Sequence, residues 1–319
     1  MLNVLVTGAA GFLGRAVVEA LIRRGGLNGP DGVQPLTALT LVDRVPATPP
    51  AAPVDTRVVV GSLVDHDLAT LIADIDVIIH LAAFLTIESE RDVAAGYDLN
   101  LHVPLRTLEA ARVAGRRPRM VFPSSIAVFG GTLPGRVSEN TVCTPQTSYG
   151  TAKAMVELML SDYARHGFVD GRAIRIPIVV TRPGLPSPVV SDIVGEVIRG
   201  PLVGRKVVSP LDPDASFPIV SVERVAENVL NLAERPADRF GASRAVHQPG
   251  LTTTPRQLVE SLERLAGERL KGRVSFAPDP AVTRVVAGWP SDFASDIDDP
   301  LVGDADVDSI VRLALARFA

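Results

Sequence analysis

Short apolar runs alternate with segments of helical spacing along the first 180 residues. The apolar runs predict strands at residues 3–7, 36–43, 56–60, 76–81, 118–124 and 173–180. Apolar residues recur every three or four positions between these runs, which predicts helices at residues 12–24, 91–114 and 149–166. Apolar strands separated by helices are typical of a parallel sheet that is covered on both faces. The pattern therefore predicts a doubly wound α/β fold.

The regular alternation weakens after Gly184. Helical spacing then returns in separated segments, at residues 186–199, 220–234, 255–267 and 304–318, with Pro and Gly between them. We expect residues 1–180 to form one domain and residues 181–319 to form mainly a smaller C-terminal lobe. Segments near residues 205–245 are expected to return to the first domain.

Charge and composition narrow the classes of function. The net charge is −4 and acidic and basic residues are interspersed, so the sequence lacks the basic patch that nucleic acids and membrane surfaces require. No apolar run is long enough to predict a membrane-spanning helix. The single cysteine, Cys143, excludes an intrachain disulfide, and five scattered histidines predict no metal site. We therefore expect a cytoplasmic protein that acts on a small molecule.

Three glycines follow the first predicted strand at the spacing of a dinucleotide-binding loop. Gly8 allows a tight turn, Gly11 allows the backbone to approach a pyrophosphate, and Gly14 allows close packing of helix on strand. The next helix begins at Phe12, and the unpaired N–H groups of its first turn can bind phosphate, so Phe12 and Leu13 are also expected at the cofactor. This context of strand, turn and helix predicts a Rossmann-type domain that binds a dinucleotide.

An acidic residue at the end of the second strand indicates which dinucleotide is bound. The carboxylate of Asp43 can accept both hydroxyl groups of the adenosine ribose and repels a 2′-phosphate, which favours NAD over NADP. Arg44 lies beside it and is also expected at the cofactor. Further cofactor contacts are predicted at Ser62, Leu63, Leu81, Ala82, Ala83, Asn100, Tyr149, Lys153 and Pro177.

Tyr149 and Lys153 predict acid–base chemistry. Their spacing of four residues places both side chains on one face of a helix. An adjacent ammonium and a cationic nicotinamide both stabilise a phenolate, so the pair can supply a general acid or base. Ser125 follows the fifth strand, where a hydroxyl faces the ligand crevice and can bind the reacting oxygen. The three residues form the predicted catalytic group.

Taken together, these motifs resemble the extended short-chain dehydrogenase/reductase superfamily. The resemblance rests on TGAAGFLG, LVD, HLAA, PSSIAVFG and SYGTAK, which cover about the first 180 residues. Further segments, PQTSYGT, GFVDGR, RPG and VVAGWP, resemble the D-erythronate dehydrogenase family over nearly the whole chain. This resemblance implies oxidation of C2 of a four-carbon sugar acid with NAD, with Ser125, Tyr149 and Lys153 as catalytic residues.

From motif position we predict a substrate site in which Thr86, Arg182 and Arg284 bind the carboxylate and Trp289 forms a wall, together with Ser125 and Tyr149. Two other functions stay open: a nucleotide-sugar epimerase of the same superfamily, and a non-catalytic dinucleotide sensor or scaffold. The amphipathic helices at residues 101–114 and 149–166 could pair across a two-fold axis, and we expect a homodimer.

Overall fold

The computed structural model describes residues 2–29, 32–180 and 189–318. Within these residues the chain forms two compact units. The first unit comprises the described residues of Met1–Val128, Pro145–Arg175 and Ala226–Val246, and the second comprises those of Phe129–Thr144, Ile176–Val225 and His247–Ala319. No helix in the described ranges is both long and apolar enough to cross a membrane.

The main sheet runs through the first unit in the order β12-β8-β6-β5-β1-β3-β2, with β4 paired to β3. Its strands are β1 (Leu2–Thr7), β2 (Gly26–Gly29), β3 (Gly32–Asp43), β4 (Asp55–Val60), β5 (Val77–His80), β6 (Arg119–Ser125), β8 (Asp170–Ile176) and β12 (Ala245–His247). β1 pairs in parallel with β3 on one side and with β5 on the other. The chain therefore builds the sheet outward from β1 in both directions. In sheets of this kind, ligands bind beside the carboxyl ends of the strands where the direction changes, which here is next to β1.

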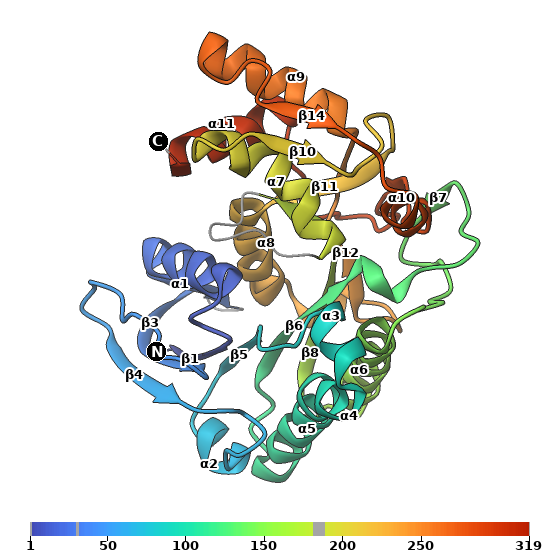
Figure 1. Ribbon diagram of the computed structural model, residues 1–319. Helices are drawn as coiled ribbons and strands as arrows, with labels where there is room; N and C mark the ends of the chain where they lie inside the picture. The colour runs from blue at the N-terminus through green and yellow to red at the C-terminus, as the bar shows by residue number, and fades with distance from the viewer. Residues whose placement is uncertain (1, 30–31, 181–188, 319) are drawn as a thin grey trace. The chain divides into compact units, whose positions relative to one another are not determined.

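Helices cover both faces of this sheet. They are α1 (Phe12–Arg24), α2 (Leu68–Ile72), α3 (Thr86–Arg91), α4 (Val93–Tyr97), α5 (Val103–Ala114), α6 (Ser148–Arg165) and α8 (Val222–Glu234). Figure 1 shows α5 and α6 on one face, and α1 with the part of α8 that belongs to this unit on the other. The core between α5, α6 and the sheet includes Leu5, Ile78, Phe122, Val156 and Leu160. The prediction of a Rossmann-type α/β fold is confirmed.

The structure adds a strand between α1 and β3 and divides one predicted helix. β2 pairs antiparallel with the start of β3, and its Leu27 is completely buried. Residues 91–114 were expected to form one helix. Instead, Asp92 caps α4 by accepting a hydrogen bond from Ala95, and a π-helical turn at Asp98–His102 precedes α5. Pro104 has no N–H to offer the carbonyl four residues before it, which accounts for the widened turn.

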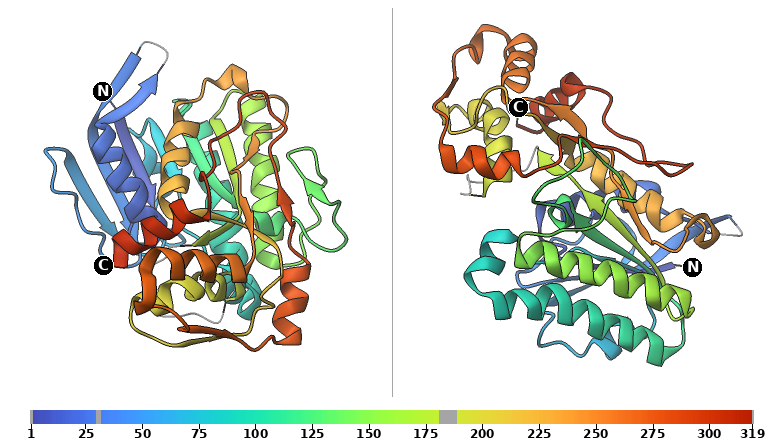
Figure 2. Two further views of the ribbon diagram at one scale, coloured as in Figure 1. Left: turned by 90° about the horizontal axis from the view of Figure 1, so that it is seen from above. Right: turned by 90° about the vertical axis from the view of Figure 1, so that its right-hand side faces the viewer.

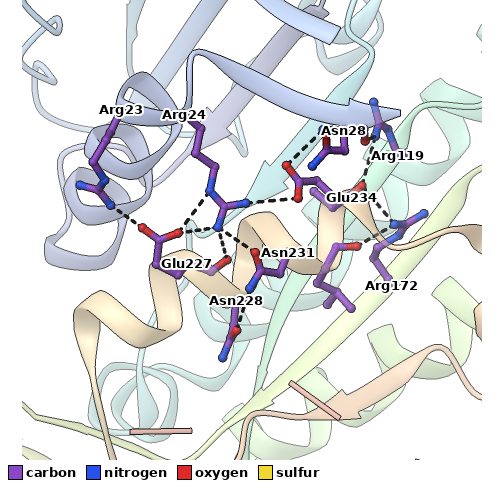
Figure 3. A network of polar contacts seen from close by, with 11 residues as sticks. Arg23, Arg24, Asn28, Arg119, Arg172, Glu227, Asn228, Asn231 and Glu234 are labelled. Atoms are coloured by element: carbon purple, nitrogen blue, oxygen red, sulfur yellow. Dashed lines mark hydrogen bonds and ion pairs between the residues drawn. The ribbon is translucent and has the colours of Figure 1, made fainter. Parts of the chain in front are cut away.

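The second part of α8 is fixed in the first unit by arginines from distant parts of the sequence. Arg24 of α1 donates to the side chains of Glu227 and Asn231 (Figure 3). Arg172 of β8 has a fully buried side chain, and its Nη1 donates to the carbonyls of Leu232, Ala233 and Arg235 at the end of α8. These bonds satisfy carbonyl groups that have no partner within a helix.

The second unit is built from short strands and four helices in its described part. The strands are β7 (Arg136–Val137), β9 (Ile178–Val180), β10 (Val207–Ser209), β11 (Phe217–Ser221), β13 (Leu251–Thr253), β14 (Val274–Phe276) and β15 (Asp292–Phe293). The helices are α7 (Val190–Leu202), α9 (Pro255–Ala266), α10 (Pro280–Ala287) and α11 (Val307–Phe318). α7 packs on β9, α11 packs on β11, and α9 packs on both of these helices. The core of this unit includes Val197, Phe217, Leu258 and Ile310.

Candidate active site

The glycine-rich loop connects β1 to α1 and has no room for larger residues. Gly8 has a φ of +67°, and a Cβ there would lie 2.8 Å from the backbone nitrogen of Ala82. A Cβ on Gly14 would lie 2.2 Å from the Gly8 carbonyl oxygen. Gly11 stands at the N-cap of α1 with no side-chain cap. The loop thus brings the start of α1 to the carboxyl edge of the sheet without a side chain over it.

Two hydrogen bonds fix the segments on either side of this loop. Asp43, the last residue of β3, accepts a hydrogen bond from the Ala10 nitrogen through Oδ2 at 2.9 Å. Thr7, the last residue of β1, accepts one from the Ala82 nitrogen at 3.1 Å. Thr7 was not among the predicted site residues, although its place at the strand end before the glycine loop could have indicated it. Asp43, the glycine loop and residues 81–83 therefore meet at one edge.

Asn100 lies in the π-helical turn, and its buried amide holds the segment that follows residues 81–83. Its Oδ1 accepts from the Phe84 nitrogen and its Nδ2 donates to the Phe84 carbonyl, both at 2.9 Å. Nδ2 also donates to Ser89 at 3.1 Å. The guanidinium of Arg44 stands 5.1 Å from the centre of the Phe84 ring. The structure thus links Arg44, Phe84 and Asn100, and a cofactor contact for Asn100 stays a prediction.

The predicted catalytic residues come together at the carboxyl end of β6 and the first turns of α6. Thr147 caps α6 by accepting a hydrogen bond from the Gly150 nitrogen at 3.0 Å. A Cβ on Gly150 would lie 2.1 Å from the Ala127 carbonyl, so glycine at this position allows α6 to approach the turn after Ser125. The Ser125 side chain lies near enough to Tyr149 to lower the pKa of its phenol.

Lys153 lies one helical turn beyond Tyr149 and is 3% exposed. Its Nζ donates to the Pro123 carbonyl at 2.8 Å, and it stands 4.3 Å from the centre of the Phe122 ring and 5.5 Å from that of the Tyr149 ring. Phe122 and Pro123 precede Ser125 on β6, and their part in holding the lysine was not predicted. One strand and one helix therefore position the whole group.

Burial shifts the pKa values of both catalytic groups away from the charged forms. It raises the pKa of Tyr149 to about 12, while the nearby Ser125 hydroxyl acts in the opposite direction and lowers it. Burial lowers the pKa of Lys153 to about 7, while the Glu157 carboxylate raises it. Burial, and then the charge of Lys153, lowers the pKa of His80 to about 3, so this imidazole is neutral.

The remaining predicted residues are distributed over both units. Ser62 and the buried Leu63 follow β4, Thr86 begins α3, and Pro177 separates β8 from β9. Arg284 is exposed on α10 in the second unit. Trp289 lies in the same unit, with its ring centre 6.2 Å from that of Phe217. Arg182 lies outside the described residues. Contacts of all these residues with cofactor or substrate stay predictions.

The residues at this edge fit a dinucleotide. The glycine loop keeps side chains away from the uncapped start of α1, whose N–H groups favour an anion such as a pyrophosphate. The second carboxylate oxygen of Asp43 can accept the ribose hydroxyls. The Ser124 hydroxyl and His80 Nε2 are buried near the end of β6 and β5, and neither has a hydrogen-bond partner among the described residues.

Comparison with known proteins gives the family. The model of the NAD dependent epimerase/dehydratase family matches residues 4–241. The chain is 38% identical to a D-erythronate dehydrogenase from Cupriavidus necator and 32% identical to another from Haemophilus influenzae, in each case over 91% of this chain and 90% of the relative.

Solved structures agree with this result. A nucleoside-diphosphate-sugar epimerase from Agrobacterium tumefaciens has a TM-score of 0.93 at 32% identity, covering 99% of this chain and 94% of that one. The holo form of an L-threonine dehydrogenase from Cupriavidus necator has a TM-score of 0.85 at 25% identity, covering 99% and 100%. The chain therefore belongs to the NAD dependent epimerase/dehydratase family, and it is an NAD-dependent dehydrogenase of the extended short-chain type.

Proposed function

We propose that this protein oxidises a secondary hydroxyl group of a small sugar acid, such as C2 of D-erythronate, with Ser125, Tyr149 and Lys153 as the catalytic residues. The observation that carries the proposal is the joint position of these three side chains at the end of β6 and the start of α6. The 38% identity to a D-erythronate dehydrogenase supports the substrate class.

Each side chain has a distinct part in the proposed reaction. Tyr149, as phenolate, takes the proton from the substrate hydroxyl group, and Ser125 binds and orients the same oxygen. Bound NAD supplies the acceptor for the hydride that leaves the carbon atom. The ammonium of Lys153, 5.5 Å from the centre of the Tyr149 ring, stabilises the phenolate. The hydroxyl group thereby loses a proton and a hydride and becomes a carbonyl group.

We infer that the first unit is the cofactor-binding domain and that the second carries much of substrate recognition. The glycine loop, Asp43 and the catalytic group all belong to the first unit. Arg284 and Trp289, in the second, are proposed to bind the substrate carboxylate and to form a wall. Thr86 and Arg182 complete the proposed substrate contacts, and a cytoplasmic location stays part of the same prediction.

The test is the appearance of reduced nicotinamide when purified protein receives NAD and a panel of four- to six-carbon sugar acids that includes D-erythronate. A Tyr149→Phe variant should bind NADH normally and lose most of its turnover. Tyr163→Phe is the matched control because Tyr163 lies on the same helix and is hydrogen-bonded to Glu109. Full activity of Tyr149→Phe would refute the catalytic assignment.

An epimerase is the second candidate, because the structure with a TM-score of 0.93 is named a nucleoside-diphosphate-sugar epimerase. Epimerisation regenerates its NAD in each cycle, so an epimerase would retain tightly bound cofactor through purification and would be stabilised by a uridine nucleotide. Bound cofactor without turnover of any alcohol or nucleotide sugar would instead indicate a dinucleotide sensor or scaffold.

We also propose a homodimer formed through α5 and α6. These helices lie side by side (Figure 2), and Val113, Met155 and Leu158 expose 75%, 43% and 73% of their surface. Exposed apolar residues on adjacent helices are typical of an interface between subunits. Leu158→Glu should reduce the molar mass measured by light scattering, whereas Val208→Glu, at an equally exposed valine of the second unit, should not. A monomeric wild-type protein would refute the dimer.

A further inference from the structure

The surroundings of Lys153 disfavour the charge that the proposed reaction requires. Nζ faces the rings of Phe122 and Tyr149, and it donates a hydrogen bond to the carbonyl of Pro123. A buried ammonium without an opposite charge tends to lose its proton. A neutral amine would stabilise the Tyr149 phenolate far less. The site therefore needs a compensating negative charge near the lysine.

Glu157 supplies a negative charge one turn further along α6. It follows Lys153 by four residues, as Lys153 follows Tyr149, so the three side chains lie along one face of the helix. Its side chain is only 6% exposed and is paired with Arg175 of β8, whose side chain is also 6% exposed. Arg175 Nε lies 3.1 and 3.2 Å from the two carboxylate oxygens, and Nη2 lies 2.8 Å from Oε2.

A buried ion pair is not required for packing at this position. Apolar side chains of similar volume often stabilise a core as well as a buried ion pair does, because both charges must be desolvated. The pair nevertheless stands on the helix face that carries the catalytic residues, with the carboxylate contributed by the same helix as Lys153. A role for its charge in catalysis accounts for this placement.

We propose that Glu157, clamped by Arg175, is a positioning residue that keeps the amine of Lys153 in its ammonium form beside Tyr149. This inference rests on the proposed function of the Ser125, Tyr149 and Lys153 group.

The other groups around Lys153 do not supply this charge. His80 of β5 is neutral, and Arg175 of β8 is occupied by Glu157 itself. On β6, Phe122 and Pro123 offer only a ring and a carbonyl. Asn100 of the adjacent π-helical turn is an amide. Among the described groups that act on the Lys153 charge, Glu157 is the one that raises its pKa.

The expected effect follows from how Tyr149 and Lys153 share their protons. Near neutral pH one proton can be lost either from Tyr149, which gives phenolate and ammonium, or from Lys153, which gives phenol and amine. The first form is active and the second is not. Each unit by which the Lys153 pKa falls reduces the ratio of active to inactive form about tenfold.

Three variants separate charge from structure. Glu157→Gln removes the carboxylate charge that faces Arg175, and the double variant Glu157→Gln/Arg175→Gln removes both charges. Glu157→Asp keeps the charge. We expect both Gln variants to lose at least about tenfold in kcat at neutral pH, with KM changed less than about twofold, and Glu157→Asp to retain most of the activity.

The matched control is Asp170→Asn. Asp170 is the partner of the buried Arg172 at the start of the same strand, about 16 Å along β8 from Arg175. This variant should lower thermal stability and leave the pH profile unchanged. If the folded double variant has the wild-type kcat and pH profile, the inference is wrong.

A second measurement needs no turnover. The chain contains three lysines, Lys153, Lys206 and Lys271, so protein labelled with ¹³C at lysine Cε gives three signals. Lys206→Arg and Lys271→Arg assign the signal of Lys153. In cofactor-free protein the pH titration of the Lys153 signal should have its midpoint near pH 7. This midpoint should fall in both Gln variants, and it should fall further in Glu157→Gln than in the double variant. An unchanged midpoint refutes the inference, whereas a wild-type protein inactive on every sugar acid refutes only the proposed function.

Discussion

Asp43 offers the sharpest test of how this chain selects its cofactor. Its Oδ2 accepts the hydrogen bond from Ala10 in the glycine loop, and its place at the end of β3 allows the carboxylate to bind the ribose hydroxyls. Asp43→Asn keeps an oxygen acceptor for Ala10 and removes the charge. Asp43→Ala removes both, so the two variants separate the charge from the support of the loop.

The magnitudes follow from these contacts. A hydrogen bond to a charged group contributes about 1.5–3 kcal/mol, so Asp43→Asn should weaken NADH binding by about 10- to 150-fold. Asp43→Ala should lose about a further 1 kcal/mol, because the Ala10 nitrogen also loses its acceptor. NADPH binding should not weaken in Asp43→Asn, since the repulsion of a 2′-phosphate disappears with the charge.

The assay is fluorescence titration of each variant with NADH and with NADPH. Asp55→Asn is the control because Asp55 is exposed at the start of the neighbouring parallel strand β4, at the opposite edge of the sheet. It should bind both cofactors as the wild type does. If Asp43→Asn binds NADH within about twofold of wild type and has the same preference between the two cofactors, the assigned role of Asp43 is wrong.

Three further predictions concern the loop, the proton transfer and the fold. Gly14→Ala should weaken NADH binding by more than about tenfold, because its Cβ would lie 2.2 Å from the Gly8 carbonyl oxygen. Gly135 has open space around it, so Gly135→Ala should bind NADH normally in the same titration. Lys153→Met should move the acid limb of the pH–rate profile for alcohol oxidation to higher pH, because Tyr149 must lose its proton without the ammonium; an unmoved limb contradicts the role of the lysine. Arg172→Met should lower the free energy of unfolding by about 3–5 kcal/mol in urea denaturation. The carbonyls of Leu232, Ala233 and Arg235 lose this buried donor, and Asp170 loses one of its two arginine partners. A loss below about 1 kcal/mol contradicts this.

The carboxyl edge of the sheet could be predicted because its signals are local. Gly8, Gly11 and Gly14 lie within one loop, and Tyr149 and Lys153 lie one helical turn apart, so chain geometry alone places them. Asp43 and Ser125 end strands that are parallel, and parallel strands present their carboxyl ends at one edge. The structure places all of these residues in the first unit.

Interactions between distant parts of the sequence could not be predicted. Glu157 faces Arg175 only because β8 runs beneath α6, and nothing in either segment alone indicates the other. The sequence also does not indicate that the amide of Asn100 binds the backbone of Phe84, sixteen residues away. The sequence predicts that segments near residues 205–245 return to the first domain, but it does not indicate that Arg24 and Arg172, far away in sequence, bind α8.

The distribution of residues over the two units suggests how relatives named for different substrates can share one fold. The proposed proton-transfer group and cofactor loop depend on contacts within the first unit, where Gly8, Gly14 and Gly150 admit no larger side chain without meeting backbone. These positions can change little while the reaction remains a hydride transfer with NAD. Arg284 on α10 is exposed and stands under no such restriction. Changes in substrate are therefore expected to arise in the second unit, while the chemistry of Tyr149, Lys153 and Glu157 stays constant.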